Sequence, residues 1–221
     1  MTWNIQFGGG NTGAQAQVIA DSGADVVLLQ EAQTWDEHMP TTYPQRLRQL
    51  TGQTWQAVWS AGSDCGSGCQ GTLILSRFPI DDSGSREMSG TTAGWAAINV
   101  GGVRVNVFNV HLEYYDTGKR SAQLEQFMNW SREFGGPRLA GGDFNSWWGE
   151  YWIRQMENEY SDTWQDVTGS DEDGYTLQGT VRFDYLFRSY DTGWRLTPQS
   201  AWVRWTDLSD HGALIADYTV Q

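Results

Sequence analysis

The apolar run Asp25–Gln30, with the sequence DVVLLQ, is the feature that most constrains what this chain can fold into. Its apolar and polar residues do not alternate, which is typical of a strand covered on both faces. A glycine pair separates Ala96–Val100 from Val103–Val110, which predicts a hairpin. Amphipathic helices are expected at Thr12–Ser22 and Gly118–Phe134. Doubly covered strands mixed with hairpins and helices predict a layered α/β (α+β) domain.

The remaining elements follow from the same patterns. Further strands are expected at Thr2–Phe7, Thr54–Ser60, Thr72–Ser76, Arg138–Gly142, Phe183–Ser189, Trp194–Trp205 and Ala213–Val220. Two more helices are expected at Tyr43–Thr51 and Glu150–Glu159, Thr12 is the expected N-cap of the first helix, and the acidic segment Asp162–Gly174 is expected to be a loop. Because neither a repeat nor a linker divides the chain, we expect one domain over residues 1–221.

The charge of the chain limits the ways in which it could bind a partner. Lys and Arg number 14 and Asp and Glu number 27, which gives a net charge of −13. This acidity argues against a protein held on nucleic acid by a basic surface, but it does not exclude an enzyme that meets phosphate through metal cations. The chain has no apolar run long enough to span a bilayer. We therefore expect a monomer without stable membrane insertion.

The only two cysteines, Cys65 and Cys69, lie close together with glycine and serine between them. Two ligands without a nearby histidine make a poor zinc site, and a redox Cys-x-x-Cys motif has one residue fewer. A small disulfide is the preferred interpretation, and two free thiols are the alternative. A disulfide implies an oxidising compartment, so we expect a secreted protein. The first residues do not resemble a signal peptide, and we expect that a natural signal was replaced by Met1.

Polar side chains stand at the ends of several predicted strands, where packing does not require them. Each one alone has an ordinary explanation, such as a solvated strand end or a turn. Asp184 is harder to explain, because a carboxylate between apolar neighbours needs a partner, and His211 is a natural one. The set consists of Asn4, Glu31, His111, Asp143, Asn145, Asp184, Asp210 and His211.

Taken together, these side chains fit one kind of chemistry. Oxygen ligands come from the side chains of Glu31, Asp143, Asn145 and Asp210. Such hard ligands suit Mg²⁺, and also Mn²⁺ or Ca²⁺. A divalent metal polarises a phosphoryl oxygen. His211 oriented by Asp184 can act as a general base or as a cation that stabilises the transition state. His111 and Asn4 offer hydrogen bonds to phosphate oxygens.

Seven short motifs carry a resemblance to a known family. In chain order they are Thr2-Trp3-Asn4-Ile5, Leu29-Gln30-Glu31, Ser76-Arg77-Phe78-Pro79, Asn109-Val110-His111-Leu112, Gly142-Asp143-Phe144-Asn145, Phe183-Asp184-Tyr185 and Ser209-Asp210-His211. A chain with these motifs in this order resembles the endonuclease/exonuclease/phosphatase family, which has the DNase I-like fold. The motifs extend over nearly the whole chain.

The resemblance implies a four-layer sandwich of two mixed β-sheets flanked by helices, and hydrolysis of phosphoester bonds with a divalent metal. It implies that Glu31 is the principal metal ligand with Asn4 beside it. Asp143 and Asn145 would position water and phosphate, and Asp210 would bind or tune the metal. His211 and Asp184 would form a pair that activates water, and His111 would hold a phosphate oxygen. Arg77 would lie on the phosphate side of the cleft. The alternative for Arg77 is an ordinary surface arginine.

Motifs that differ between classes of this family reduce the number of substrate classes to consider. The Cys65–Cys69 loop resembles the small disulfide loop of pancreatic-type deoxyribonucleases, although its spacing is one residue longer. Phosphoinositide phosphatases carry Cys-Asp-Arg near the position of Asp184, so that class is disfavoured. Trp147 and Trp148 follow the Asp-Phe-Asn motif and either line the cleft, where they could stack on a base, or pack the next helix.

The leading hypothesis from the sequence is therefore a secreted, divalent-metal-dependent nuclease. It would hydrolyse phosphodiester bonds of DNA, or of RNA, with little sequence preference. A phospholipid phosphodiesterase resembling bacterial sphingomyelinases is the alternative enzyme, although those proteins are usually longer and carry a membrane-entering hairpin. A non-catalytic binding module with the same fold is the third hypothesis, and it is disfavoured because no residue of the expected catalytic set is missing.

Overall fold

The computed structural model describes residues 1–7, 11–34, 38–62, 69–190 and 196–221. Within these residues the strands form two mixed sheets of six strands each. The first sheet contains, in spatial order, β11 (Leu196–Arg204), β12 (Ala213–Val220), β1 (Thr2–Asn4), β2 (Val26–Gln33), β4 (Gln70–Ser76) and β3 (Gln56–Ala61). The second contains β5 (Ile80–Met88), β6 (Thr91–Val100), β7 (Val103–His111), β8 (Arg138–Asp143), β10 (Asp184–Ser189) and β9 (Tyr160–Asp162).

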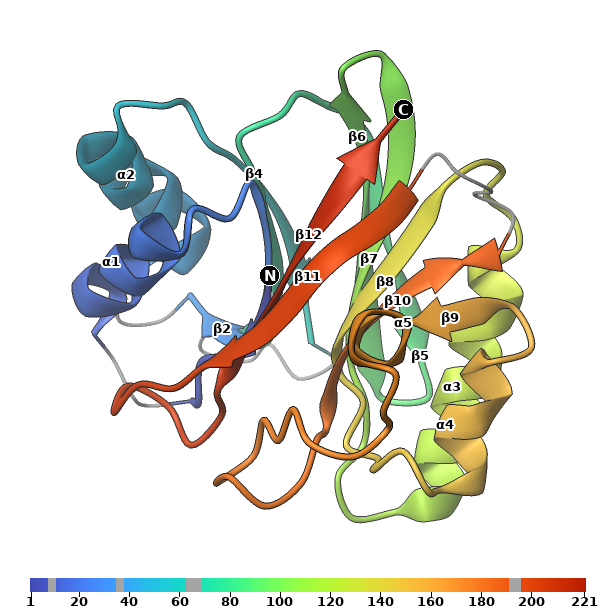
Figure 1. The fold of residues 1–221 in the computed structure, drawn as a ribbon. Helices are drawn as coiled ribbons and strands as arrows, with labels where there is room; N and C mark the ends of the chain where they lie inside the picture. Colours follow the sequence, from blue (N-terminus) through green and yellow to red (C-terminus); the bar gives the residue numbers. More distant parts are fainter. Residues whose placement is uncertain (8–10, 35–37, 63–68, 191–195) are drawn as a thin grey trace.

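Helices cover the outer faces of both sheets (Figure 1). On the side of the first sheet lie α1 (Thr12–Ser22) and α2 (Met39–Thr51), and on the side of the second lie α3 (Thr117–Ser131) and α4 (Tyr151–Met156). The short helix α5 (Thr163–Thr168) contacts β10 and β11. Each outer layer has its own apolar core, and a third core lies between the sheets. The predicted four-layer sandwich is thereby confirmed.

The position of β2 explains why its sequence is apolar on both sides. Val27 and Leu29 belong to the core under α1 and α2, whereas Leu28 belongs to the core between the sheets. All three side chains are at most 1% exposed. Successive side chains of a strand point to opposite faces, so a strand in the middle of four layers buries every residue. The sandwich therefore follows directly from the DVVLLQ run.

The strand directions bring the candidate residues to one edge of the sandwich. In the first sheet β1 runs parallel to β2, so that Asn4 pairs with Gln30. In the second sheet β7 runs parallel to β8, so that His111 pairs with Asp143. The carboxyl ends of these four strands thus carry polar residues. Because β10 and β12 run antiparallel to their neighbours, they begin at the same edge, where Asp184 and His211 lie.

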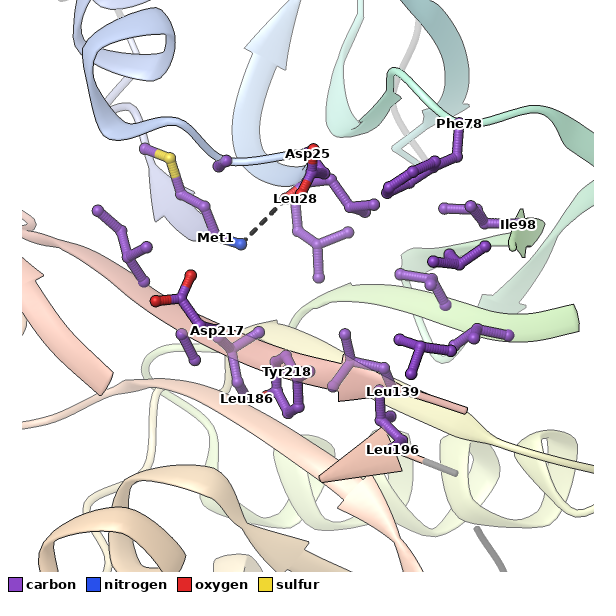
Figure 2. Close-up of a pocket in the computed structure, with 18 of the residues that line it drawn as sticks. Met1, Asp25, Leu28, Phe78, Ile98, Leu139, Leu186, Leu196, Asp217 and Tyr218 are labelled. Carbon is purple, nitrogen blue, oxygen red and sulfur yellow. Dashed lines mark hydrogen bonds between the residues drawn. The ribbon is translucent and has the colours of Figure 1, made fainter. Parts of the chain in front are cut away.

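A pocket of about 300 Å³ opens between the two sheets at their other end (Figure 2). Its walls are mostly apolar, and Asp25 and Asp217 also line it. Leu28, Ile98 and Leu186 contribute from three different strands and belong to the core between the sheets. The two sheets are consequently in close contact beneath the polar edge and leave a space between them at the opposite end.

The structure differs from the sequence expectations at several boundaries. The N-cap of α1 is Asn11 rather than Thr12, and its Oδ1 accepts a hydrogen bond from the Ala14 amide. α2 begins at Met39, four residues earlier than expected. β5 was not expected, and the acidic segment Asp162–Gly174 contains α5 and the end of β9 instead of being only a loop. Among the described helices, none has the length and hydropathy that a membrane span requires.

Candidate active site

Asn4 joins two carboxylates that come from different sheets. Its Nδ2 lies 3.0 Å from Oε1 of Glu31 and 3.0 Å from Oδ2 of Asp143, and it donates to both. Its Oδ1 accepts the amide of Gln6 at 3.0 Å, which holds the side chain in this orientation. Asn4 is buried at the end of β1. The two carboxylates are therefore held side by side at the floor of the site.

The backbone of β2 turns Glu31 toward this site. The pairing of β2 with β4 shifts register between Leu29 and Ala32, as in a β-bulge, and Glu31 has a φ of 60°. Bulges re-aim side chains and are frequent beside active sites. A positive φ in a residue other than glycine is uncommon and costs free energy. The Phe7 amide donates to Oε2 of Glu31 at 2.5 Å, which fixes the second oxygen.

His211 and Asp184 form a buried pair on the other side of Asp143. Nδ1 of His211 lies 2.7 Å from Oδ2 of Asp184, and Asp184 is fully buried. The Asp184 amide donates to the hydroxyl of Thr176. The carbonyl of His211 accepts a hydrogen bond from the indole of Trp3, and its amide donates to Ser209. These contacts fix the ring, so that Nε2 is the nitrogen directed toward Asp143.

Two imidazoles approach Asp143. Nε2 of His111 lies 3.7 Å from its Oδ2, and Nε2 of His211 lies 3.9 Å from the same oxygen. Burial and the charge of Asp184 raise the pKa of Asp143 to about 6. Burial alone lowers the pKa of His211, but the charge of Asp184 and its hydrogen bond outweigh burial and raise that pKa to about 9. Asp184 therefore favours the imidazolium form of His211 over the neutral ring.

A close approach of β8 to β7 places Asp143 and Asn145. Gly142 has a φ of 143°, and a Cβ there would lie 2.0 Å from the carbonyl oxygen of Val110, so only glycine fits. Asn145 has a φ of 48°. Its amide donates to Oδ1 of Asp143, and its Nδ2 donates to the Leu112 carbonyl, both at 2.8 Å. The loop after β8 is therefore tied to the end of β7.

The structure thus brings together most of the predicted site residues, which are Asn4, Glu31, His111, Asp143, Asn145, Asp184 and His211. Asp210 precedes His211 and is half-buried, and its charge raises the pKa of His211. Its backbone oxygen accepts the Gln178 amide. The structure places Asp210 beside the site without a described contact to Glu31.

Arg77 is not brought to this site. It follows β4, which runs antiparallel to β2, so it lies beside Asp25 at the start of β2 and not beside Glu31 at its end. Its guanidinium is ion-paired with Asp25 and donates to Gln53. This location corresponds to the surface arginine that the sequence left as the alternative. The guanidinium is thus on the opposite edge from the carboxylates that would meet phosphate.

Trp147 and Trp148 follow Asn145, as expected, and their ring centroids are 5.4 Å apart. Trp147 is exposed and Trp148 is half-buried, with Arg154 of α4 over its ring. Trp148 therefore contacts the following helix, and Trp147 faces solvent. Of the predicted cysteine pair, Cys65 lies outside the described residues, so the Cys65–Cys69 disulfide stays a prediction.

The donor set fits a divalent cation. One side-chain atom each from Asp143, Asp184 and His211 lies within 4.8 Å of the others, and Glu31 shares Asn4 with Asp143. Oδ1 of Asp184 is buried without a hydrogen-bond partner among the described residues. Burial, and after it repulsion by the charge of Asp184, raises the pKa of Asp143. A hard cation with oxygen ligands would relieve this repulsion.

Sequence reasoning missed three residues that support the site. Gln30 Nε2 donates to Oδ1 of Asn109 at 2.7 Å, which links β2 to β7 between the sheets. Both residues are in the motifs quoted above, and their burial in an apolar strand was the available signal. The third is Thr176, whose hydroxyl accepts the amide of Asp184. No local pattern marks Thr176, because its partner lies in a different element.

Comparison with known proteins agrees with this geometry. The model of the endonuclease/exonuclease/phosphatase family matches residues 1–211. The chain belongs to this family. Its members are phosphoester hydrolases that use divalent metals, and the buried group of Asp143, Asp184 and His211 is compatible with such a metal. No curated protein matches the chain closely enough to add a more specific assignment.

Solved structures of the family share the fold. A family protein from Leptotrichia buccalis C-1013-b has a TM-score of 0.81 at 17% identity, covering 98% of this chain and 97% of that one. The human Nocturnin catalytic domain with bound sulfate anion has a TM-score of 0.79 at 18% identity, covering 99% and 92%. Bacteroides thetaiotaomicron mannosyl-6-phosphatase has a TM-score of 0.73 at 13% identity, covering 99% and 98%. At these identities the likeness concerns the fold alone.

Proposed function

We propose that this chain is a divalent-metal-dependent phosphodiesterase, and specifically a secreted nuclease that hydrolyses DNA, with RNA as a second substrate, with little sequence preference. The observation that carries the proposal is the Asn4 bridge between Glu31 and Asp143, set beside the His211–Asp184 pair. This arrangement offers oxygen ligands on one side and an oriented imidazole on the other. Phosphoester hydrolysis requires both.

The metal would be held by Glu31 together with Asp143 and the neighbouring Asn4. Mg²⁺ is the favoured ion, and Mn²⁺ or Ca²⁺ suits the same oxygen ligands. When bound, such an ion polarises a phosphoryl oxygen and stabilises the charge that develops there. Asn4 fixes the spacing of the two carboxylates through its single Nδ2, and Phe7 holds the second oxygen of Glu31.

The residues around Asp143 would accept the proton of the attacking water and donate hydrogen bonds to the phosphate. Asp184 accepts from Nδ1 of His211 and thereby leaves Nε2 facing Asp143 and the substrate side. As a base, this pair would take the proton of the attacking water, and as an imidazolium it would stabilise charge on the phosphate. Asp143 and Asn145 would position that water. His111, 3.7 Å from Asp143, would donate to a phosphate oxygen.

A lipid phosphodiesterase resembling sphingomyelinases is the second candidate, and one observation favours it. Several aromatic side chains near the site are exposed, and Tyr115 is 87% exposed. Tyrosine and tryptophan are suited to the interface of a bilayer. Secretion is proposed on the strength of the cysteine pair alone, because disulfides persist in oxidising compartments.

The test is hydrolysis by the purified chain with Mg²⁺ or with chelator. The substrates are plasmid DNA, RNA, bis-p-nitrophenyl phosphate and sphingomyelin vesicles. We expect cleavage of DNA and of the small diester that chelator abolishes. Turnover of the small diester without cleavage of DNA contradicts the nuclease, and choline-phosphate release in its place supports the lipid enzyme.

Matched variants test the site itself. Asp143→Ala and His211→Ala should abolish hydrolysis of every substrate while the circular dichroism spectrum is retained. His38→Ala is the control, because this histidine is exposed at the start of α2 and its side chain bonds only to Thr41 among the described contacts. Retained turnover in both site variants would refute the assignment.

A further inference from the structure

Exposed aromatic side chains surround the site, and they come from the same loops as its catalytic residues. The exposed aromatic residues of this edge are Phe7, Tyr114, Tyr115, Trp147, Tyr175 and Trp205. Phe7, Tyr114, Tyr115 and Trp147 come shortly after the ends of β1, β7 and β8, which carry site residues, whereas Tyr175 and Trp205 come from the loops before β10 and after β11. We call this set the aromatic rim. A rim of this kind is unusual for an exposed surface, because large apolar side chains rarely gather there without a ligand.

On the side of the metal ligands, the rim is attached to the site by short lengths of chain. Phe7 donates its own amide to Oε2 of Glu31, so its ring lies on the chain that holds the carboxylate. Trp147 is two residues beyond Asn145 and packs over Gly149, where a Cβ would lie 2.1 Å from its ring. Trp147 is thus held against its own loop and still exposes 44% of its surface.

On the side of the His211–Asp184 pair, two more aromatic residues are in place. A Cβ at Gly212 would lie 3.1 Å from the ring of Trp205, so this indole covers the backbone directly after His211. Tyr175 precedes Thr176, whose hydroxyl accepts the Asp184 amide and whose carbonyl accepts the Gly212 amide. The rim therefore extends to both sides of Asp143.

Three cations near this edge are paired with carboxylates. Lys119 lies 2.8 Å from Glu113, and Arg182 lies 2.6 Å from Asp162 and is buried. Arg120 is buried as well, and it pairs with Glu150 and donates to the carbonyl oxygens of Glu113 and Tyr114. The net charge of −13 also disfavours binding of a phosphate backbone through bulk positive charge. Contacts to the bases are an alternative source of affinity.

We infer that the aromatic rim stacks on unpaired nucleobases, so that the preferred substrate is single-stranded nucleic acid; this inference rests on the nuclease function proposed above. A base presents an aromatic face to Trp or Tyr only when it is not stacked within a duplex. Duplex binding depends on cations that contact phosphates, and Lys119, Arg120 and Arg182 near this edge are already paired with carboxylates. Stacking tolerates every base, which agrees with a nuclease that has little sequence preference.

The experiment compares one labelled oligonucleotide as a single strand and as a duplex, with the full chain and Mg²⁺ at physiological salt. We expect kcat/KM for the single strand to exceed that for the duplex at least about fivefold, the factor of one weak stacking contact. Trp205→Ala and Trp147→Ala should each raise the KM for the single strand by a similar factor. Trp205→Phe should restore most of the loss, because the ring face is kept.

Trp202→Ala is the matched control, since Trp202 is an exposed tryptophan within β11 and outside the rim. Its KM should equal that of the unchanged chain. Equal kcat/KM on single strand and duplex overturns the inference, as does an unchanged KM in both rim variants. Hydrolysis of bis-p-nitrophenyl phosphate is measured in parallel. It distinguishes an active enzyme that has no preference for single strands from a protein that does not hydrolyse phosphodiesters. Phosphatidylcholine vesicles that bind the unchanged chain but not Trp205→Ala would assign the rim to lipid instead and overturn the inference.

Discussion

Nδ1 of His211 lies 2.7 Å from Oδ2 of Asp184, although the two residues are 27 positions apart and belong to different sheets. Asp184 begins β10 of the second sheet, and His211 stands just before β12 of the first. The pair is therefore assembled only when the two sheets pack together. The same is true of Asn4, which donates to Glu31 of its own sheet and to Asp143 of the other.

Asp184→Asn keeps the volume of this side chain and removes its charge. Without that charge the imidazole loses the interaction that orients it and stabilises its cation. We expect kcat for bis-p-nitrophenyl phosphate to fall by about 10²- to 10⁴-fold, the usual contribution of an acid–base group. Asp166→Asn is the control, because Asp166 pairs with Arg188 away from the site. Turnover of Asp184→Asn at the level of this control contradicts the role of the pair.

The metal-free protein should lose stability as the pH rises. The pKa of Asp143 is raised from 3.8 to about 6, and that of His211 from 6.5 to about 9. A raised pKa means that the folded state binds protons more tightly, so this stabilisation is complete below the unfolded pKa and is lost as pH passes through the folded one. In chelator, Tm should therefore fall between pH 6.5 and 9.

Thermal unfolding with and without Mg²⁺ tests this expectation. Mg²⁺ should raise Tm more at pH 9 than at pH 6, because it replaces the protons that the site has lost. His211→Gln should flatten the decline between pH 6.5 and 9. A Tm in chelator that stays constant over this range, while the unchanged chain remains folded, is the contrary result.

The buried bond between Gln30 and Asn109 should hold the two sheets in register beneath the site. Asn109 also donates to the carbonyls of Leu29 and Leu73, so Asn109→Leu leaves several buried groups without partners. We expect a loss of about 1–3 kcal/mol in the free energy of unfolding, measured with urea. The exposed Asn158→Ala should cost less than about 0.5 kcal/mol.

A double-mutant cycle separates this bond from simple loss of packing. Gln30→Leu combined with Asn109→Leu should cost less than the sum of the single changes, since both partners are then apolar. Strict additivity would show that the two side chains do not act together.

The cysteine pair can be tested without activity. Iodoacetamide should leave the unreduced, denatured chain unlabelled and should label both Cys65 and Cys69 after reduction, as seen by mass spectrometry. Reduction should lower the free energy of unfolding by about 2 kcal/mol, the value for so short a loop in the chain-entropy model. The Cys65→Ser/Cys69→Ser variant should match the reduced protein and be insensitive to reductant. Labelling without reduction would contradict the disulfide and remove the argument for secretion.

Helices and strands of this protein could be predicted from the sequence where the local pattern of apolar residues matches the side that is buried in the fold. The expected ranges Thr12–Ser22 and Ala213–Val220 agree with the observed helix and strand. In both elements the spacing of apolar residues along the sequence reflects which side is packed against the rest of the protein. Asn4, Glu31, Asp143 and the other polar strand ends were likewise identifiable, since packing offers no reason for them. The distances between these side chains could not be predicted from the sequence, because they depend on how the two sheets pack together.

Where partners are distant in the sequence, the pattern fails. β5 has an edge position and only Met88 is fully buried, so its own sequence carries no alternation, and pairing with β6 alone makes it a strand. Asp162 is buried because Arg182 pairs with it, which no inspection of an acidic segment reveals. The sequence left two interpretations of Arg77 open, because a motif tells nothing of strand direction, and β4 runs opposite to β2.

The apolar pocket between the sheets has a consequence for how this scaffold could be altered. It lies at the end of β2 that is remote from Glu31, and its lining residues, such as Ile98 and Leu186, take no part in the chemistry (Figure 2). Larger apolar side chains placed there would add buried surface where the native packing is incomplete. Substitutions in this pocket are therefore a way to raise the stability of the fold at a distance from the carboxylates and imidazoles of the site.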